Sequence, residues 1–154
     1  MTASDPIDQI MAVMEAAFDP AWGEAWNRRQ VSDALIMPHT FAILVDAEGQ
    51  TCEDCSRDAA GFVLTRHAPG EEELLLIAVT PEQRGRGLGR KLLSHLARDA
   101  RERGAERIFL EMRSNNPAER LYRDFGFEPI GRRPNYYLLA DGNRMDAITF
   151  GLSI

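Results

Sequence analysis

The strongest chemical signal in this chain is residues 84–91, Arg-Gly-Arg-Gly-Leu-Gly-Arg-Lys, where glycines alternate with larger and mostly basic residues. The segment stands between an apolar run and a long amphipathic stretch, where a strand is expected to turn into a helix. Glycine allows positive φ and close approach, and a helix N-terminus carries partial positive charge. The backbone amides, assisted by Arg84, Arg86, Arg90 and Lys91, can therefore bind a phosphate or pyrophosphate.

Two common phosphate-binding fingerprints do not fit this segment. A Walker A loop ends in Gly-Lys-Ser/Thr, whereas Arg90 precedes Lys91 and Leu92 follows it. The dinucleotide fingerprint needs a glycine at its sixth position, which is Arg90 when counted from Gly85. A glycine-rich turn with solvated arginines is the plainer alternative. Three glycines and their flanking cations at a strand-to-helix junction favour the anion site.

The elements beside this turn follow from the spacing of apolar residues. Residues 74–79 form a continuous apolar run, which predicts a central strand with both faces covered. Residues 87–103 place leucines and alanines on one helical face, and Gly104 follows where a helix end favours a left-handed residue. In residues 107–113 apolar positions alternate, so a strand there displays Glu111 opposite a buried face.

The rest of the chain completes one mixed α/β domain over residues 1–154. We expect a first helix with Asp5 as N-cap and apolar residues up to Phe18, a second helix at residues 24–36 and a short one at residues 117–124. Strands are expected at residues 41–45 and 61–66, which should pair as a hairpin, and at residues 127–132 and 145–152 around a turn at residues 141–143. No repeat or interdomain linker interrupts this order.

Residues 84–89 resemble the acetyl-CoA signature of the GCN5-related N-acetyltransferases (GNAT), Gln/Arg-x-x-Gly-x-Gly/Ala after a bulged central strand. The resemblance covers about residues 24–154 and is closest over residues 74–137. Within the family the chain is most similar to bacterial ribosomal-protein alanine N-acetyltransferases, through Leu110-Glu111-Met112-Arg113, Ser114-Asn115, Ala118, Leu121-Tyr122, Gly126-Phe127, Asn135-Tyr136-Tyr137 and Asp146-Ala147. It implies the GNAT fold, a central, mostly antiparallel sheet that is splayed beside its central strand and flanked by helices.

By position, the resemblance assigns roles to individual residues. Glu111 corresponds to the general base and Tyr122 to the general acid. The pantetheine arm of acetyl-CoA would pair with the main chain of Ile77 and Val79, and Asn115 would contact the cofactor. The pyrophosphate would be held by Arg84, Gly85, Arg86, Gly87, Leu88, Gly89 and Arg90. Acetyl transfer then needs a neutral primary amine that attacks directly, with a backbone amide near Val79 as the candidate oxyanion donor.

Plainer interpretations stay open beside these roles. Glu111 alone would be read as the exposed face of an edge strand, and Tyr122 as a half-buried aromatic. Two departures from the family stand out: one residue fewer than usual precedes Ser114-Asn115, and the strand that normally precedes the first helix is nearly absent. Cys52 and Cys55 have the spacing of half a zinc site, but no second pair of ligands follows. We therefore expect a polar hairpin loop and no metal.

Composition and charge limit the partners. The chain has 154 residues and a formal net charge of −6, which disfavours a general nucleic-acid coat. No apolar run approaches the roughly 20 residues of a membrane-spanning helix, and residues 1–19 lack signal-peptide features. We expect a cytoplasmic protein without direct nucleic-acid or membrane binding, present as a monomer or weak dimer.

The acidic residues gather in the first part of the chain. Residues 1–60 hold 11 acidic and 3 basic side chains, whereas residues 61–154 hold 13 and 15. In the family, the region of Asp19, Glu24 and Asp33 borders the acceptor cleft, which favours a cationic acceptor such as the N-terminus of a basic protein. Aromatic candidates for the walls of this cleft are Trp22, Trp26, Tyr136 and Tyr137.

Three functions fit these observations. The first is an acetyl-CoA-dependent N-acetyltransferase acting on the α-amine of the N-terminal alanine of a ribosomal or other basic protein. The second is an acetyltransferase for a small amine such as a polyamine, amino acid or antibiotic, with the same fold and cofactor site. The third is a non-catalytic acyl-CoA-binding module, against which the presence of both Glu111 and Tyr122 argues.

Overall fold

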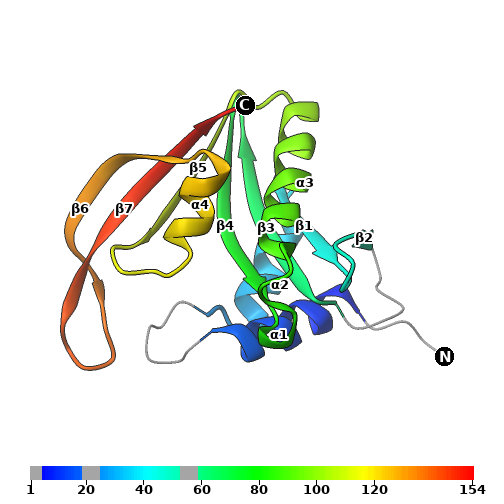
Figure 1. The fold of residues 1–154 in the computed structure, drawn as a ribbon, viewed down its shortest axis with the longest axis horizontal. Coiled ribbons are helices and arrows are strands. Elements are labelled where there is room, and N and C mark those ends of the chain that lie inside the picture. Colours follow the sequence, from blue (N-terminus) through cyan, green and yellow to red (C-terminus); the bar gives the residue numbers. More distant parts are fainter. Residues whose placement is uncertain (1–4, 19–24, 53–58) are drawn as a thin grey trace.

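The chain forms one twisted sheet with helices on both faces (Figure 1), seen here in a computed structural model that describes residues 5–18, 25–52 and 59–154. The described helices are α1 (Pro6–Ala17), α2 (Arg28–Ile36), α3 (Leu88–Glu102) and α4 (Glu119–Phe125), with a 3₁₀ turn η2 (Pro81–Gln83). The described strands are β1 (Thr40–Val45), β2 (Thr51–Cys52), β3 (Gly61–Ala68), β4 (Glu71–Val79), β5 (Arg107–Arg113), β6 (Glu128–Leu138) and β7 (Arg144–Ser153). They lie in the order β2-β1-β3-β4-β5-β7-β6.

Capping residues determine where α1 and α2 begin. The Asp5 side chain accepts a hydrogen bond from the Ile7 amide at 2.9 Å, and a proline occupies the first turn of α1, as predicted. The predicted start of the second helix at residue 24 is wrong. A reciprocal capping box between Asn27 and Gln30 starts α2 at Arg28, because it satisfies amides that would otherwise lack partners.

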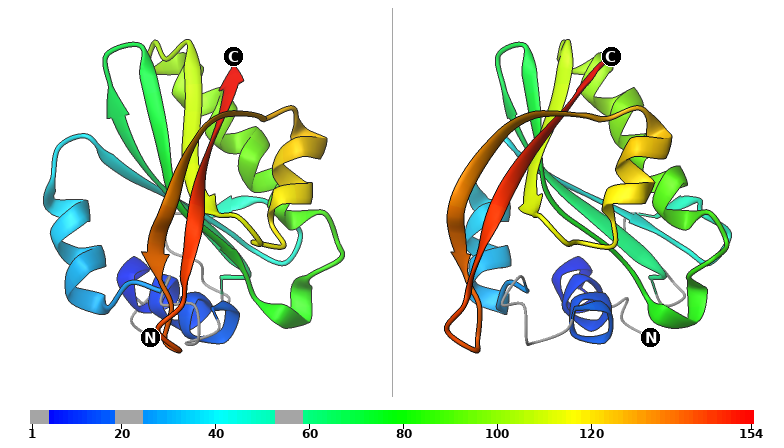
Figure 2. Two further views of the ribbon diagram at one scale, coloured as in Figure 1. Left: turned by 90° about the vertical axis from the view of Figure 1, so that its left-hand side faces the viewer. Right: turned by 60° about the vertical axis from the view of Figure 1, so that its left-hand side comes forward.

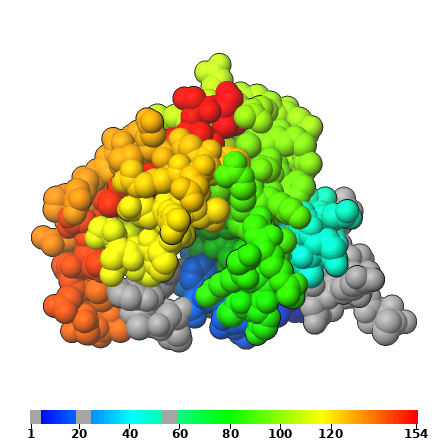
Figure 3. All heavy atoms as spheres, viewed as in Figure 1, coloured from blue at the N-terminus to red at the C-terminus, as the bar shows by residue number. Residues whose placement is uncertain are grey.

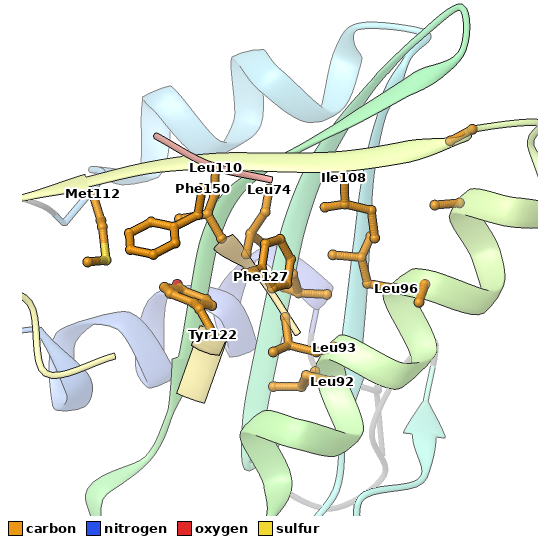
Figure 4. Close-up of a cluster of buried hydrophobic side chains, with 14 of the residues drawn as sticks. Leu74, Leu92, Leu93, Leu96, Ile108, Leu110, Met112, Tyr122, Phe127 and Phe150 are labelled. Carbon is orange, nitrogen blue, oxygen red and sulfur yellow. The ribbon is translucent and has the colours of Figure 1, made fainter. Parts of the chain in front are cut away.

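The sheet separates two apolar cores. On one face α3 and α4 cover a cluster that includes Leu92, Leu96, Leu110 and Phe150 (Figure 4). On the other face α1 and α2 cover a second cluster. It includes Ile10, Met14, Val31, Phe62 and Leu76. Figure 2 shows α1 and α3 on opposite sides of the strands. The central strand β4 contacts both α1 and α3, so both of its faces are covered, as the apolar run predicted.

The sheet is mostly antiparallel and splays at its centre. The parallel pair β4–β5 is joined only from Glu71 opposite Arg107 to Glu73 opposite Phe109, and the other pairs are antiparallel. A bulge then leaves Leu75 of β4 without a partner on β3, so Leu74 packs in the α3 core while Leu76 packs in the α1 core. Beyond the bulge β4 and β5 diverge (Figure 1). The predicted splayed, mostly antiparallel sheet is confirmed.

The remaining elements confirm the helices and strands predicted from apolar periodicity, and they correct the predicted end of one strand. β1 and β3 pair as the predicted hairpin partners, and α3 ends before Gly104, whose φ is +90°. β5 and β7 lie where alternation placed them. β6 continues to Leu138, so the predicted end at residue 132 is wrong. The sequence could not show the longer strand, because nearly all of its side chains are exposed and give no alternating pattern.

Candidate active site

The glycine-rich turn links β4 to α3, as the sequence predicted. Gly85 and Gly87 have φ of +79° and +78°, and a Cβ on either would meet no described atom within 4 Å. Gly87 is also the N-cap of α3, and no described side chain caps that helix end. The first amides of α3 are therefore left to a ligand or solvent, with the positive end of the helix dipole behind them.

Arg84 fastens this turn to the rest of the fold. Its Nε donates to the Val79 carbonyl at 3.3 Å, and a terminal guanidinium nitrogen donates to the Ala17 carbonyl at 3.0 Å. These two bonds join the turn to the end of β4 and to the end of α1. Arg84 thus lines the cleft while its guanidinium positions the loop.

The other two arginines of the turn differ in placement. Arg90 lines the cleft, with its guanidinium carbon 5.6 Å from the centroid of the Phe125 ring. Arg86 donates to the Gln83 side chain at 2.9 Å and is absent from the described cleft wall. Of the predicted pyrophosphate-binding residues, those in the wall are Arg84, Gly85, Gly87, Leu88, Gly89 and Arg90.

The edge of β4 beyond the splay forms one wall. Ile77 and Val79 both line the cleft, and they lie past the last residue of β4 that pairs with β5. On the other side β4 is paired with β3 as far as Val79. The β5-facing edge of β4 can therefore take an extended ligand chain in place of a neighbouring strand.

Glu111 stands on the opposite wall, on β5. Its Oε2 lies 3.5 Å from Thr149 Oγ1, across the β5–β7 pair, and 3.4 Å from Nε of Arg133 on β6. The side chain is 26% exposed. Because β7 pairs along the whole of β5, Glu111 is not displayed on an edge strand. It is the sole carboxylate among the described residues that line the cleft.

Tyr122 comes to the cleft from α4. The residue is buried, and its ring packs edge-to-face on Phe127 with centroids 5.7 Å apart. Figure 4 shows it beside Met112 and Phe150, at the boundary of the α3 core. Tyr122 is thus both a core aromatic and a cleft residue, and the same cleft brings it together with Glu111.

The predicted cofactor contact Asn115 lies elsewhere. Its side chain is exposed, accepts a hydrogen bond from Arg113 and is absent from the described cleft wall. The next residue, Asn116, lines the cleft, and its Oδ1 accepts from the Ala118 amide at 2.9 Å. In a Ser-Asn-Asn run, spacing alone does not tell which asparagine lines the cleft.

The N-terminal helices supply the remaining wall. Trp26 and Gln30 line the cleft, and Tyr137 of β6 joins them from across it. Trp26 also packs on the α1 core, so this residue is both part of the cleft wall and part of the core packing. Gln30 was missed, because its only sequence signal is that of a helix cap. Asp33 pairs with Arg29 at 3.8 Å and does not line the cleft. Asp19, Trp22, Glu24 and the Cys55 loop lie outside the described residues.

These walls enclose a cleft of about 850 Å³. In Figure 3 the surface is hollowed between the yellow segment before α4 and the green segment around the glycine-rich turn. We call the part beside Arg84 and Arg90 the cofactor end, and the part beside Glu111, Trp26 and Tyr137 the acceptor end. An anionic ligand at the first and an amine at the second could meet along the open edge of β4.

Comparison with known proteins decides the family. The sequence profile of the Acetyltransferase (GNAT) family matches residues 7–127. The chain belongs to the GNAT family. A GNAT relative from Escherichia coli (strain K12), the [ribosomal protein bS18]-alanine N-acetyltransferase, is 42% identical over 96 residues, which are 62% of this chain and 64% of that protein. The protein of the same name from Haemophilus influenzae is 30% identical over 119 residues, 75% of this chain and 82% of the relative.

A solved structure supports the same membership. The crystal structure of the ribosomal-protein-S18-alanine N-acetyltransferase from Escherichia coli superposes with a TM-score of 0.78 at 27% identity, covering 99% of this chain and 92% of that one. Among the described residues of this GNAT chain, no helix has the length and apolar character to cross a bilayer. The same residues offer no group of three metal-ligating side chains.

Proposed function

We propose that this chain is an acetyl-CoA-dependent N-acetyltransferase that acetylates the α-amine of an N-terminal alanine on a ribosomal or other basic protein. The observation that carries the proposal is one cleft whose wall includes Glu111, Tyr122 and the open glycine-rich turn. The family membership supports acetyl transfer. The names of the relatives support a ribosomal-protein alanine as acceptor.

The residues at the cofactor end fit acetyl-CoA. The open space beside Gly85 and Gly87 and the first amides of α3 suit a pyrophosphate, and Arg90 adds positive charge. The β5-facing edge of β4 suits the amide-rich pantetheine arm. Bound there, acetyl-CoA supplies a thioester whose carbonyl carbon accepts the amine.

At the acceptor end, the chain's own groups carry the proton transfers. An α-amine with a pKa near about 8 is mostly protonated at neutral pH, so Glu111 accepts a proton from it, directly or through water. A backbone amide near Val79 donates to the oxygen on which negative charge develops. Tyr122 donates a proton to the departing sulfur. No nucleophilic side chain is required, since the amine attacks directly in a ternary complex.

The test is a CoA-release assay over a panel of Ala-initiated basic peptides and free small amines, with products identified by mass spectrometry. We expect acetylation at the peptide α-amine. Acetylation of the free amines alone would replace the proposal with a small-molecule acetyltransferase. No turnover with any acceptor, together with tight acetyl-CoA binding, would leave the acyl-CoA-binding module.

Two variants examine the proposed roles. Glu111→Gln and Tyr122→Phe should each lower kcat by roughly a hundredfold or more, as loss of a general base or acid does. Both should keep acetyl-CoA affinity in calorimetric titration, because neither residue belongs to the glycine-rich turn or to β4. Unchanged turnover in both variants would refute these roles.

A further inference from the structure

β6 departs from a regular ladder where it passes the acceptor end. Arg133 pairs with Ala147 of β7, and the next paired residue is Tyr137, opposite Met145. Three residues of β6 therefore stand opposite the single residue Asp146. Within this bulge Asn135 has a φ of +53°, which makes it the one non-glycine residue with positive φ in the described chain. A conformation of this kind persists only where surrounding contacts hold it.

Asp146 makes the contacts that hold this bulge. Its Oδ1 accepts the Asn135 amide at 2.9 Å, and its Oδ2 accepts Nε of Arg132 at 2.7 Å. The bonds from the Asn135 amide and the Arg132 guanidinium hold the pKa of Asp146 below its ordinary value. Its backbone carbonyl also accepts the Ser114 amide at 3.0 Å, at the start of the loop from Glu111 to Tyr122.

The two ends of the bulge carry the side chains that reach the acceptor end. Tyr137 lines the cleft, and its ring packs at 90° on Tyr136 with centroids 5.2 Å apart. At the other end, Arg133 lies over the Tyr136 ring at 5.3 Å and places its Nε 3.4 Å from Glu111 Oε2. The bulge thus sets both a wall residue and the charged neighbour of the proposed base.

We propose that Asp146 is a positioning residue for the acceptor, which fixes the β6 bulge so that Tyr137 and Arg133 stand correctly beside Glu111. The inference deepens the proposed function and rests on it for the identity of the acceptor. Asp146 itself is absent from the described cleft wall, so it acts through these neighbours. Its substitution should weaken acceptor binding and leave the cofactor end untouched, because the described hydrogen bonds of Asp146 lead to Arg132, Asn135 and Ser114 and not to the glycine-rich turn.

The first experiment is steady-state kinetics on Asp146→Ala and Asp146→Asn with an Ala-initiated basic peptide. Loss of a hydrogen bond to a charged group corresponds to a KM increase of roughly tenfold or more for the peptide in Asp146→Ala. Asp146→Asn keeps an acceptor oxygen for the Asn135 amide but loses the charge that pairs with Arg132, so its increase should be smaller. The KM for acetyl-CoA should stay within twofold in both variants.

Two comparisons guard against a merely structural effect. Glu71→Gln removes a carboxylate that lies 3.4 Å from Arg107 at the other end of the sheet, and it should leave both KM values unchanged. Arg132→Gln removes one partner of the Asp146 carboxylate from an exposed position, so it raises the peptide KM even if Asp146→Ala folds poorly. An equal rise in both KM values, or none in either Asp146 variant, would overturn the proposal.

A measurement independent of activity separates this inference from the proposed function. Hydrogen exchange at the Asn135 amide should accelerate at least tenfold in Asp146→Ala, while exchange in α3 is unchanged. If the wild type acetylates only small amines, the proposed acceptor is wrong, and the same kinetic comparison is made with the amine that reacts. If exchange at Asn135 is unaltered, Asp146 does not hold the bulge, whatever the acceptor is.

Discussion

At the scale of single residues, one carboxylate with several partners lies away from the cleft. Glu72 of β4 is fully buried, and its carboxylate accepts hydrogen bonds from Nε and Nη2 of Arg103 and from Oγ1 of Thr65 at 2.9 Å, and contacts Nδ1 of His67 at 2.8 Å. It also sits in the short parallel ladder, opposite Ile108. The cluster therefore ties together the strands just before they diverge to form the cleft.

Removing the charge of Glu72 should destabilise the fold. Glu72→Gln leaves the Arg103 guanidinium without its anion and lowers the free energy of unfolding by about 3 kcal/mol, as expected for a broken buried pair. Glu71→Gln, the adjacent exposed carboxylate, should cost less than about 1 kcal/mol. Urea denaturation of both variants measures the difference. Equal losses in the two variants would show that the buried cluster is not a stabilising feature.

The same cluster predicts a dependence of stability on pH. Burial raises the pKa of Glu72, but hydrogen bonds from Arg103, His67 and Thr65 outweigh it and hold that pKa below its ordinary value. A lowered folded-state pKa means that stability is present above the unfolded value of about 4.3 and is lost as pH falls through the folded value. Urea midpoints measured below pH 5 should therefore fall more steeply in the wild type than in Glu72→Gln. Parallel slopes would contradict this.

The placement of a single residue could be predicted from the sequence where that residue lies in a regular element. The resemblance alone assigns Glu111 its role as general base, which stays a prediction. Its place opposite buried Leu110 and Met112 could be predicted from the alternation in β5. Asn116 and Gln30 could not, because their place in the cleft depends on where a loop and a capped helix end meet other elements. The single-residue shortening before Ser114 did not separate Glu111 from Tyr122, which share the cleft.

At the scale of elements, the glycine-rich turn and α3 work as one unit. Gly87→Ala places a side chain in the left-handed region at a cost of about 1 kcal/mol, and the N-cap must shift to relieve it. Acetyl-CoA should then bind roughly tenfold more weakly, because the first amides of α3 turn away from the ligand. Isothermal titration calorimetry checks this directly.

Gly70→Ala is the matched control for that measurement. Gly70 has a φ of +79° and equally open surroundings, but it lies in the β3–β4 turn at the other end of β4. Its substitution should cost similar stability and leave acetyl-CoA affinity unchanged. Weakening in both variants would mean that the general loss of stability, and not the turn geometry, controls binding.

Elements with a strong period were predictable, and exposed ones were not. Leucines at helical spacing predicted α3, and alternating apolar residues predicted β5, because each element buries one face and the buried positions give the pattern. β6 has one partly buried position among its 11 residues, so its sequence shows neither its length nor its register. Pairing with β7 determines both. The start of α2 depended on a local hydrogen-bond exchange between Asn27 and Gln30 rather than on any apolar pattern.

At the scale of the whole molecule, the cleft joins two parts of the chain with different charge. The turn and α3 belong to residues 61–154, which hold 13 acidic and 15 basic side chains. The wall formed by Trp26 and Gln30 belongs to residues 1–60, which hold 11 acidic and 3 basic side chains. We expect the excess of acidic residues in 1–60 to attract a cationic acceptor, and the arginines of the glycine-rich turn to attract an anionic cofactor.

This asymmetry predicts how salt affects the choice of acceptor. At about 0.01 M salt the Debye length is about 30 Å, so an Ala-initiated basic peptide should be acetylated with a higher kcat/KM than an acidic peptide of equal length. At about 1 M salt that length is about 3 Å, and the preference should shrink toward unity because exposed charges are screened. The kcat/KM ratio of the two peptides at each salt concentration isolates this effect, since changes in cofactor binding are common to both. Equal kcat/KM values at both concentrations would show that the acidic segment does not select the acceptor, and selectivity would then have to come from contacts at Glu111, Trp26 and Tyr137.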